Sequence, residues 1–414
     1  MPVRDWTNGV ALERLHGVSE LISIDEARRR VLEAVRSLPA EDVGLDEALG
    51  RVLAELVESP IDVPPFDSSA MDGYAVVAGP ETELEIVGES RAGHPADERV
   101  RPGTAIRIST GAALPDGATA VVPVELAETP ASANGRVRVG PSMPGDNVRR
   151  AGEDVRAGRV VLAAGTPLGP AELGVTASVG RAEPRCARRP RVAVLVTGDE
   201  LTEPGRPLAP GGIYSSNGWA LAGQVERAGA LVTARETVPD TAAETRAALS
   251  QALDDSNLVI VSGGVSVGPH DHVKPALAGL DVEERFWGVR LRPGKPTWFG
   301  TRGNALVFGL PGNPVSAMVA FHLFVHPALA ALQGADPSAR TAAATLDEPI
   351  PRHPTREQAV RMRLEQAQGS WRARPTGPQG SHMLTSMLGA TALARIAPGQ
   401  GEVPAGAQVE VELL

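Results

Sequence analysis

Cysteine, lysine and long apolar runs are nearly absent from this chain of 414 residues. The single cysteine, Cys186, excludes an intramolecular disulfide framework and fits a reducing compartment. The first residues contain no uncharged apolar segment of the kind that a signal peptide needs. No stretch approaches about 18 uninterrupted apolar residues. We therefore expect no membrane span and a cytoplasmic location.

Lysine is the scarcer of the two strong cations. Of the 40 basic residues, only Lys274 and Lys295 are lysine, and the rest are arginine. The net charge of −10 argues against binding to nucleic acid or to an anionic membrane, so we expect neither. An anionic substrate must then be held by local cations, a metal ion or backbone amides. Both lysines lie in or near glycine-rich loops, where a compact point charge suits phosphate.

The N-terminal half predicts a mixed domain with an all-β insertion. Residues 24–38 have the apolar spacing of a helix, with Ser23 as its N-cap. Residues 45–54 are expected to continue as helix or turn. Between residues 75 and 144, short β-rich runs alternate with glycine and proline, which indicates a small β domain. A mixed pattern returns at 145–185, so we interpret the β domain as inserted into an elongated first domain.

The C-terminal half alternates strand-like and helix-like segments over residues 190–335, ending in a long helix from Pro314 to Leu332. Such alternation indicates a parallel, doubly wound sheet. Residues 340–414 have short strand-like runs between glycine and proline turns, which we interpret as a small β-barrel. No repeat with a period of about 20–50 residues is present. The predicted fold class is therefore a multidomain α/β plus β protein.

The segment around which we organise the functional interpretation is LVIVSGGVSVGPHDHVK at residues 258–274. An apolar run that ends at Ser262-Gly263-Gly264 is typical of a buried strand followed by a glycine turn. Adjacent glycines adopt conformations closed to other residues and let a ligand approach bare N–H groups. Open α/β sheets bind ligands at the carboxyl ends of their parallel strands. A tight turn without any ligand is the alternative, and this segment alone favours neither.

Carboxylates follow three successive strands of the predicted sheet. Asp199 and Glu200 come after the first strand, Asp240 after the second and Asp271 after the third. Since the carboxyl ends of parallel strands share one edge, we expect these side chains to converge. Carboxylates so gathered need a cation between them, and Mg²⁺ is the natural candidate beside a phosphate. Each aspartate alone could instead be a helix N-cap.

Two further loops suit an anion. The first, Arg292-Pro293-Gly294-Lys295-Pro296, is cationic and stiffened by proline, with a solvated turn as the alternative. The second, GLPGNPVS at 309–316, has the pattern of a strand end, a glycine loop and a helix start. Neither matches a P-loop or a dinucleotide-binding fingerprint. The histidines of His270-Asp271-His272 lack zinc-motif spacing, and no GxSxG elbow is present.

Together the motifs resemble those of the molybdopterin molybdenumtransferases, the MoeA-type molybdenum insertases related to the E domain of gephyrin. The matching stretches run in order along nearly the whole chain: PPFDSSAMDGYA at 64–75, RISTGAALPDGATAVV at 107–122, NVRRAGED at 147–154, TGDEL at 197–201, YSSNG at 214–218, SGGVSVGPHD at 262–271, RPGKPTWFG at 292–300, GLPGNPVSA at 309–317 and QGSHML at 379–384.

The resemblance implies a subunit of four parts. They are an elongated domain at 19–57 and 145–186, an inserted β domain at 58–144, an α/β molybdopterin-binding domain at 187–336 and a C-terminal β-barrel at 340–414. It also implies a homodimer in which the inserted domain of one subunit completes the site on the α/β domain of the other. The implied reaction is Mg²⁺-dependent insertion of molybdate into adenylyl-molybdopterin, with release of AMP. Transient contact with the preceding adenylyltransferase and with apo-molybdoenzymes would follow.

Carried position by position, the resemblance assigns Asp72 and Thr110 to the wall that the second subunit contributes. Glu200, Asp240 and Asp271 match the acidic catalytic and metal site. The remaining matches are substrate-binding positions: Gly198, Asp199, Ser262, Gly263, Gly264, Ser266, Gly268, Lys274, Arg292, Lys295, Pro311, Asn313, Arg149, Arg150, Arg356 and Ser381. Arg361 also matches a position near the site, but Gln358-Ala359 stands where the family usually has an acidic–aromatic pair.

Two other functions compete with this one. An adenylyltransferase acting one step earlier uses a similar α/β domain, usually without the N-terminal and C-terminal domains expected here, and it would consume ATP without needing molybdate. A scaffold, as in the gephyrin E domain, would bind partners without catalysis. The arginine and alanine bias and the absence of a long attached linker argue against the scaffold. Molybdate-dependent AMP release separates the insertase from both alternatives.

Overall fold

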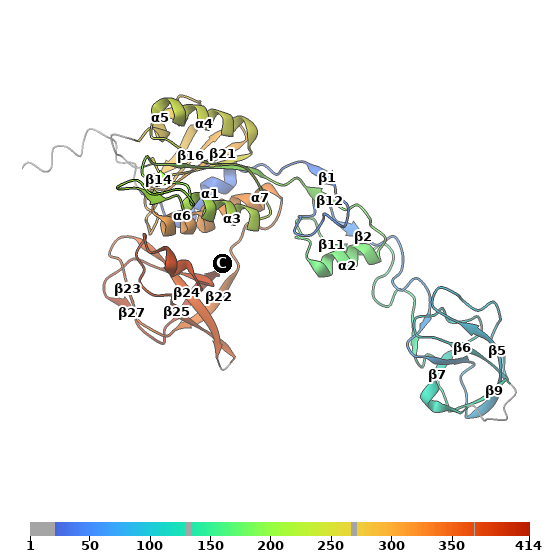
Figure 1. Cartoon of the computed structure of the whole chain (residues 1–414). Coiled ribbons are helices and arrows are strands. Elements are labelled where there is room, and N and C mark those ends of the chain that lie inside the picture. Colours follow the sequence, from blue (N-terminus) through green and yellow to red (C-terminus); the bar gives the residue numbers. More distant parts are fainter. Residues whose placement is uncertain (1–20, 129–134, 266–270, 368) are drawn as a thin grey trace, which may run out of the picture. The chain divides into compact units, whose positions relative to one another are not determined.

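The computed structural model describes residues 21–128, 135–265, 271–367 and 369–414, and these form two compact units (Figure 1). The inserted unit is Asp42–Cys186, and the larger unit combines the residues up to Glu41 with Ala187–Leu414. The larger unit is therefore built from two stretches of chain. The four domain boundaries expected from the sequence stay a prediction.

A six-stranded sheet forms the centre of the larger unit, in the order β16-β13-β17-β21-β20-β18. Its strands are β13 (Arg191–Thr197), β16 (Leu231–Val238), β17 (Leu258–Ser262), β18 (Glu283–Trp287), β20 (Trp298–Arg302) and β21 (Ala305–Leu310). The first four in this order are parallel, as predicted. The strand β20 departs from the predicted parallel arrangement, because it is antiparallel to both neighbours. Only Gly303 and Asn304 join β20 to β21, and two residues allow a hairpin but no crossover.

Helices cover both faces of this sheet (Figure 1). The helices α1 (Ile24–Ala34), α3 (Asn217–Arg227), α6 (Pro314–Ala320) and α7 (His326–Leu332) lie on one face, and α4 (Ala242–Asp255) and α5 (Val273–Ala278) on the other. Successive strand residues point to opposite faces. Thus Val192 and Val194 join the first core cluster, while Ala193 and Leu195 join the second. This alternation explains why the central strands are apolar throughout.

The predicted helix from Pro314 to Leu332 is present, but its middle widens. A π-helical segment, η2 (Phe321–Val325), separates α6 from α7. By length and composition this stretch is a candidate membrane span, yet 72% of its apolar part is buried inside the protein. Such burial is typical of the core helix of a globular protein.

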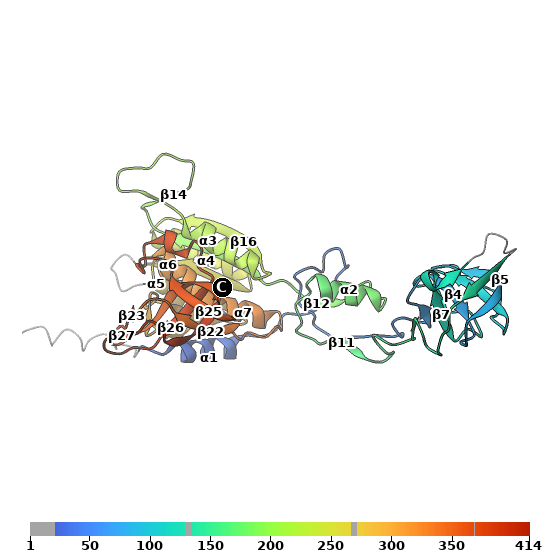
Figure 2. The ribbon, with the colours of Figure 1, turned by 90° about the horizontal axis from the view of Figure 1, so that it is seen from below.

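Helix α1 begins as the sequence predicts and ends earlier. The Ser23 hydroxyl accepts a hydrogen bond from the backbone N–H of Glu26 at 3.1 Å, which caps the helix. The helix stops at Ala34 instead of residue 38, because Val35 is extended. The chain then reaches Leu38, whose N–H binds the carbonyl of Leu332. Figure 2 shows α1, in blue, beside α7 and the C-terminal strands.

The C-terminal residues form the predicted β-barrel. Five strands close on themselves in the order β24-β25-β22-β28-β26, with a further pairing of β24 to β26. They are β22 (Thr341–Leu346), β24 (Glu357–Ala367), β25 (Ser370–Pro375), β26 (Ala392–Ile396) and β28 (Gln408–Leu413). Alternate residues such as Val360 and Met362 fill the interior. The short strand β19 (Leu291–Arg292) pairs parallel to the start of β24 and so joins the barrel to the α/β part.

The inserted unit contains a six-stranded sheet in the order β7-β4-β6-β5-β9-β8. Its strands are β4 (Gly73–Val76), β5 (Thr82–Ser90), β6 (Thr104–Ile108), β7 (Ala120–Pro123), β8 (Ala127–Glu128) and β9 (Arg136–Val139). Tyr74 and Ala75 point into separate core clusters on its two faces. Residues 45–54 form turns and short bridges, not a helix, because Leu53 pairs with Cys186 and its N–H binds the carbonyl of Thr166.

The remaining elements are short. Helix α2 (Pro170–Ser178) lies in the inserted unit, and η1 (Val124–Leu126) and η3 (Leu384–Met387) are single 3₁₀ turns. Paired short strands are β1 (Ala40–Asp42) with β12 (Arg185–Ala187), β2 (Val57–Glu58) with β11 (Val160–Leu162), β3 (Ser68–Ser69) with β10 (Val148–Arg149), β14 (Leu201–Thr202) with β15 (Ile213–Tyr214), and β23 (Ile350–Pro351) with β27 (Glu402–Val403).

Candidate functional site

The strand order reverses between β13 and β17 in the larger unit. After β13 the chain adds β16 on one side, and after β16 it returns to add β17 on the other. In open α/β sheets, ligands bind beyond the carboxyl ends of the strands at such a reversal. The loops that follow Thr197 and Ser262 meet at this point, since a Cβ at Gly263 would contact the Thr197 carbonyl, and their role in binding stays a prediction. The predicted binding residues Ser266 and Gly268, and His270, lie outside the residues that the structure describes.

Both glycines of the turn after β17 are required by its backbone. Gly263 has φ +97° and Gly264 has φ +60°, a region that L-residues rarely adopt. A Cβ at Gly263 would lie 2.7 Å from the carbonyl oxygen of Thr197, and a Cβ at Gly264 would lie 2.6 Å from Val273 Cγ2. The turn therefore keeps its bare backbone next to β13, as the two glycines predicted.

One buried amide ties three loops together, and sequence reasoning missed it. Asn217, at the start of α3, donates from Nδ2 to Ser262 Oγ at 2.9 Å and to the Gly312 carbonyl at 2.8 Å. Ser262 Oγ in turn donates to the carbonyl of Pro311 at 3.2 Å. Asn217 lies in the stretch YSSNG, whose motif match was the one available signal. Its amide fixes the spacing between the β17 turn and the loop that opens α6.

Asp271 is the most unusual carboxylate near these loops. Both its oxygens are buried, and neither accepts a hydrogen bond of good geometry from the described residues, although the N–H groups of Val273 and Lys274 lie nearby. Burial raises the pKa of Asp271, against the opposing effects of the Lys274 charge and of the N–H groups of Val273 and Lys274. The Lys274 ammonium lies 4.3 Å from the centre of the Trp287 ring, and burial lowers its pKa. A buried carboxylate of this kind is suited to a cation or to a proton.

The other predicted acids do not join Asp271. The Asp199 carboxylate accepts a hydrogen bond from the N–H of Asp240 at 3.0 Å, so these two loops do meet. The Glu200 carboxylate folds back to Gly198, where a Cβ would lie 2.6 Å from it. Within the described ranges, no group of three or more His, Cys, Asp or Glu side chains could hold a metal ion. The structure thus brings the Asp199 and Asp240 loops together, and the convergence of all four acids, Asp199, Glu200, Asp240 and Asp271, stays a prediction.

A pocket of about 200 Å³ lies where the cationic loop meets the barrel. Arg292 and Pro293 line it on one side, and Gln358–Arg361 with Gln379 and Gly380 on the other. Arg292 is exposed, whereas Arg361 is fully buried and donates to carbonyls and to Ser386 Oγ. Burial lowers the pKa of Arg361 to about 10. The pocket is thus lined by the cationic Arg292 and by the neutral Gln358, whose amide oxygen accepts from the His353 N–H, and this lining suits an oxyanion.

The other cationic candidates are near this pocket but do not line it. Arg356 Nη2 lies 3.0 Å from His353 Nε2. Burial and the charges of Arg356 and Arg292 lower the pKa of His353, so both guanidiniums act on the same imidazole. Lys295 is exposed, and the carbonyl of Ser381 binds the N–H of Val315 at the start of α6. Asn313 is the N-cap of that helix.

In the inserted unit, Asp72 and Thr110 form a local pair. The N–H and hydroxyl of Thr110 donate to Asp72 Oδ1 at 2.6 and 2.9 Å, and these bonds lower the pKa of Asp72. Arg150 Nη1 donates to Asp67 Oδ2 at 2.6 Å. Arg149 is exposed on β10. These residues therefore present two ionised carboxylates, Asp72 and Asp67, and exposed arginines at the surface of the inserted unit.

Three family models match the chain in succession. Residues 22–180 match "MoeA N-terminal region (domain I and II)", residues 193–331 match "Probable molybdopterin binding domain", and residues 343–414 match "MoeA C-terminal region (domain IV)". The fold and these matches define the class of protein, a MoeA-type protein with a molybdopterin-binding domain.

Relatives along the whole length specify the family. Molybdopterin molybdenumtransferase from Haemophilus influenzae is 37% identical, with 95% of this chain and 98% of the relative covered. Molybdopterin molybdenumtransferase 2 from Mycobacterium tuberculosis is 38% identical, with 94% and 98% covered. A crystal structure of a molybdopterin biosynthesis MoeA protein from Pyrococcus horikoshii OT3 has a TM-score of 0.81 at 31% identity, with 95% and 100% covered. The chain belongs to the MoeA family of molybdopterin molybdenumtransferases.

Proposed function

We propose that this protein inserts molybdate into adenylyl-molybdopterin with release of AMP. The observation that carries the proposal is the arginine-lined pocket between the cationic loop and the barrel, in the same unit as a glycine turn at a strand-order reversal. Two anions must be held near one another for this reaction. The pocket supports a tetrahedral oxyanion beside Arg292, and the bare backbone of Gly263 and Gly264 supports a phosphate or the pterin.

The chain's own residues would act by binding and positioning. The hydrogen bonds of Asn217 and Ser262 hold two loops together. These loops would receive the nucleotide or the pterin. Lys274 would offset the negative charge of the phosphoanhydride, and Arg292 and Lys295 that of molybdate. Orientation of the two anions and stabilisation of the charge on the transferred group would supply most of the rate. The described residues contain no evident general base beside the glycine turn.

Mg²⁺ fits one carboxylate of this site. Asp271 offers two buried oxygens that accept no hydrogen bond of good geometry from the described residues, and hard oxygen ligands are what Mg²⁺ prefers. Because proteins commonly hold Mg²⁺ through one or two carboxylates plus substrate phosphates, Asp271 would hold the ion together with the substrate. Glu200 and Asp240 are the further candidates. The ion would neutralise charge on the phosphate oxygens.

We further propose that two copies of the chain share each site. Asp72 and Thr110 would face the α/β part of a second copy, where the ionised Asp72 could accept hydrogen bonds from the substrate. Mixing an inactive Asp271→Ala protein with an inactive Asp72→Ala protein tests this, since mixed dimers would contain one intact site. Activity recovered on mixing is the expected result, and no recovery in mixed dimers would contradict the shared site.

The decisive assay is AMP release from adenylyl-molybdopterin with and without molybdate. Release that depends on molybdate, together with activation of an apo-molybdoenzyme, is expected. The adenylyltransferase alternative predicts AMP transfer from ATP to molybdopterin when molybdate is absent. A protein that binds molybdopterin but releases no AMP under either condition would contradict the proposed function. The same assay at graded Mg²⁺ concentrations tests the metal, and a cytoplasmic location and transient contacts with neighbouring enzymes stay proposals.

A further inference from the structure

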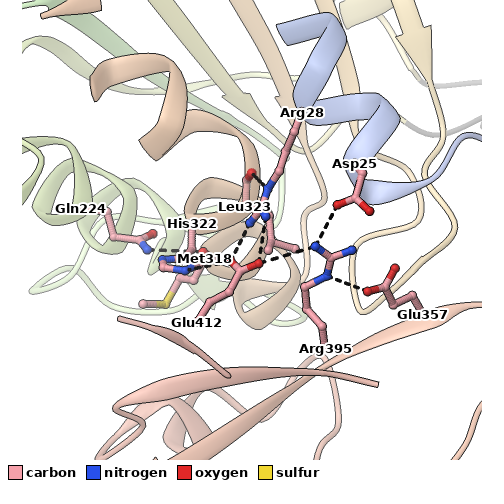
Figure 3. A network of polar contacts seen from close by, with 9 residues as sticks. All are labelled: Asp25, Arg28, Gln224, Met318, His322, Leu323, Glu357, Arg395 and Glu412. Carbon is pink, nitrogen blue, oxygen red and sulfur yellow. Dashed lines mark hydrogen bonds and ion pairs between the residues drawn. The ribbon is translucent and has the colours of Figure 1, made fainter. Parts of the chain in front are cut away.

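A network of charged side chains joins α1 to the C-terminal barrel (Figure 3). Arg28 on α1 donates from Nη1 and Nη2 to the two oxygens of Glu412 on β28, at 2.8 and 2.5 Å. Its Nε donates to the carbonyl of Leu323 in the π-helical segment at 2.9 Å. His322 Nε2 lies 3.5 Å from Glu412 Oε2. The three guanidinium nitrogens of Arg28 therefore bind β28 and the π-helical segment at the same time.

Arg395 on β26 extends this network toward the anion pocket. Its Nε donates to Glu357 Oε1 at 2.6 Å, and its Nη1 donates to Asp25 Oδ1 at 2.8 Å. Nη1 also lies 3.7 Å from Glu412 Oε1. The Glu357 side chain is 20% exposed and that of Asp25 is 72% exposed. The same guanidinium thus has one enclosed partner and one largely solvated partner.

Glu357 stands next to the residues that line the pocket. It is the first residue of β24, where it pairs with Leu291, and the next pair in the register is Gln358 with Arg292. The N–H of Glu357 donates to the carbonyl of Arg290 at 2.9 Å. Arg292 and Gln358 both line the pocket of about 200 Å³. Any shift at the start of β24 would therefore change the distance across the pocket.

We propose that Glu357 is a positioning residue of the anion pocket, holding the start of β24 through Arg395 so that Gln358 and Arg292 keep their places. The identity of the anion as molybdate rests on the proposed function. Glu357 itself does not line the pocket, so it acts through its neighbours.

The direction in which molybdate affinity changes when Glu357 is replaced distinguishes a positioning role from a purely electrostatic one. Removing the Glu357 carboxylate takes a negative charge away from a cationic pocket and leaves Arg395 less neutralised. By Coulomb's law alone, an anion would then bind more tightly. If Glu357 positions the pocket, the anion binds more weakly, because the spacing between Arg292 and Gln358 is no longer held.

The test measures molybdate binding to the full-length protein by titration calorimetry. Glu357→Ala is expected to weaken binding about tenfold. Glu357→Gln is expected to restore it to within about threefold of the unsubstituted protein, since an amide oxygen still accepts from Arg395 Nε. Asp25→Ala is the matched control, because it removes a carboxylate from the same arginine on the exposed side, and it should stay within twofold. Amide hydrogen exchange at 289–294 and 356–362 should accelerate in Glu357→Ala alone.

Molybdate binding by Glu357→Ala that is unchanged or tighter would overturn the proposal, and so would an equal weakening in Asp25→Ala. If Glu357→Ala does not fold, Arg395→Lys replaces it. A lysine cannot reach both carboxylates, so at least threefold weaker binding is expected and unchanged binding is contradictory. If the unsubstituted protein binds no molybdate, the proposed function loses its anion site, while the hydrogen-exchange comparison still decides whether Glu357 positions the pocket.

Discussion

The buried carboxylate of Glu412 should stabilise the larger unit by about 3 kcal/mol at neutral pH. Its side chain is only 3% exposed and contacts Arg28 and His322. Burial raises the pKa of Glu412, but the contacts with His322 and Arg28 outweigh it and lower the pKa from 4.5 to about 2. Since each unit of pKa shift corresponds to about 1.4 kcal/mol, this lowering of the Glu412 pKa corresponds to about 3 kcal/mol of folding free energy.

The pH dependence follows from the same shift. Because the folded state holds the lower pKa, the stabilisation is complete above about pH 4.5 and is lost as the pH falls through about 2. Between these values the unfolded chain binds the proton first. About half of the stabilisation, roughly 1.4 kcal/mol, should remain near pH 3.

Urea unfolding of Glu412→Gln against the unsubstituted protein measures the effect. The probe is placed in the larger unit, because the chain forms two compact units and a chain of this kind need not unfold in one step. We expect a loss of about 3 kcal/mol at pH 7 that shrinks as the pH falls toward 2. Glu33→Gln is the control, since Glu33 is 60% exposed, pairs with Arg29 on the surface and should change stability by less than about 1 kcal/mol. A loss below about 1 kcal/mol for Glu412→Gln, or one that is constant between pH 7 and pH 3, would refute the reasoning.

Three further substitutions test the loops around the glycine turn. Gly264→Ala should lower the free energy of unfolding by about 1–3 kcal/mol in denaturant and abolish AMP release, because the backbone has φ +60° and the new Cβ would meet Val273. Wild-type activity would contradict this. Asn217→Ala should raise KM for adenylyl-molybdopterin and cost about 1–3 kcal/mol, since it leaves the Gly312 carbonyl unpaired; an unchanged KM would show that the loop spacing does not depend on this amide. Asp271→Asn should be at least as stable at pH 7 as the unsubstituted protein, because burial raises the pKa of Asp271 and so penalises its charged form. The same substitution should abolish Mg²⁺-dependent activity. Reduced stability in a thermal melt would contradict the first expectation.

Local patterns predicted those parts of the fold that depend on neighbours in sequence. The Ser23 cap, the glycine turn after β17 and the central apolar strands each follow from a few adjacent residues. The hairpin of β20 and β21 was missed because two residues, Gly303 and Asn304, decide the strand direction. The end of α1 was missed because its last predicted turn gives way to a contact of Leu38 with Leu332.

The parts of the site that depend on distant pairing could not be predicted. Arg28 and Glu412 are 384 positions apart, and neither belongs to a short motif with known chemistry. Asn217 is 95 positions from the carbonyl of Gly312 that it binds. The expected gathering of acids around a cation stays a prediction, and a local contact that it did not foresee is the hydrogen bond from the Asp240 N–H to the Asp199 carboxylate.

The division of the larger unit into two stretches of chain has a consequence for synthesis on the ribosome. Helix α1 buries Ile24, Ala27 and Val31 in a core that includes Phe321 and Leu323 of the π-helical segment. These partners follow Ala34 by nearly 290 residues, so at about 5–20 residues per second they emerge about 15–60 s later. During that interval the whole inserted unit, Asp42–Cys186, leaves the ribosome and can fold. The apolar face of α1 therefore lacks these partners in the nascent chain during that interval. A chaperone that shields short amphipathic helices would bind it there.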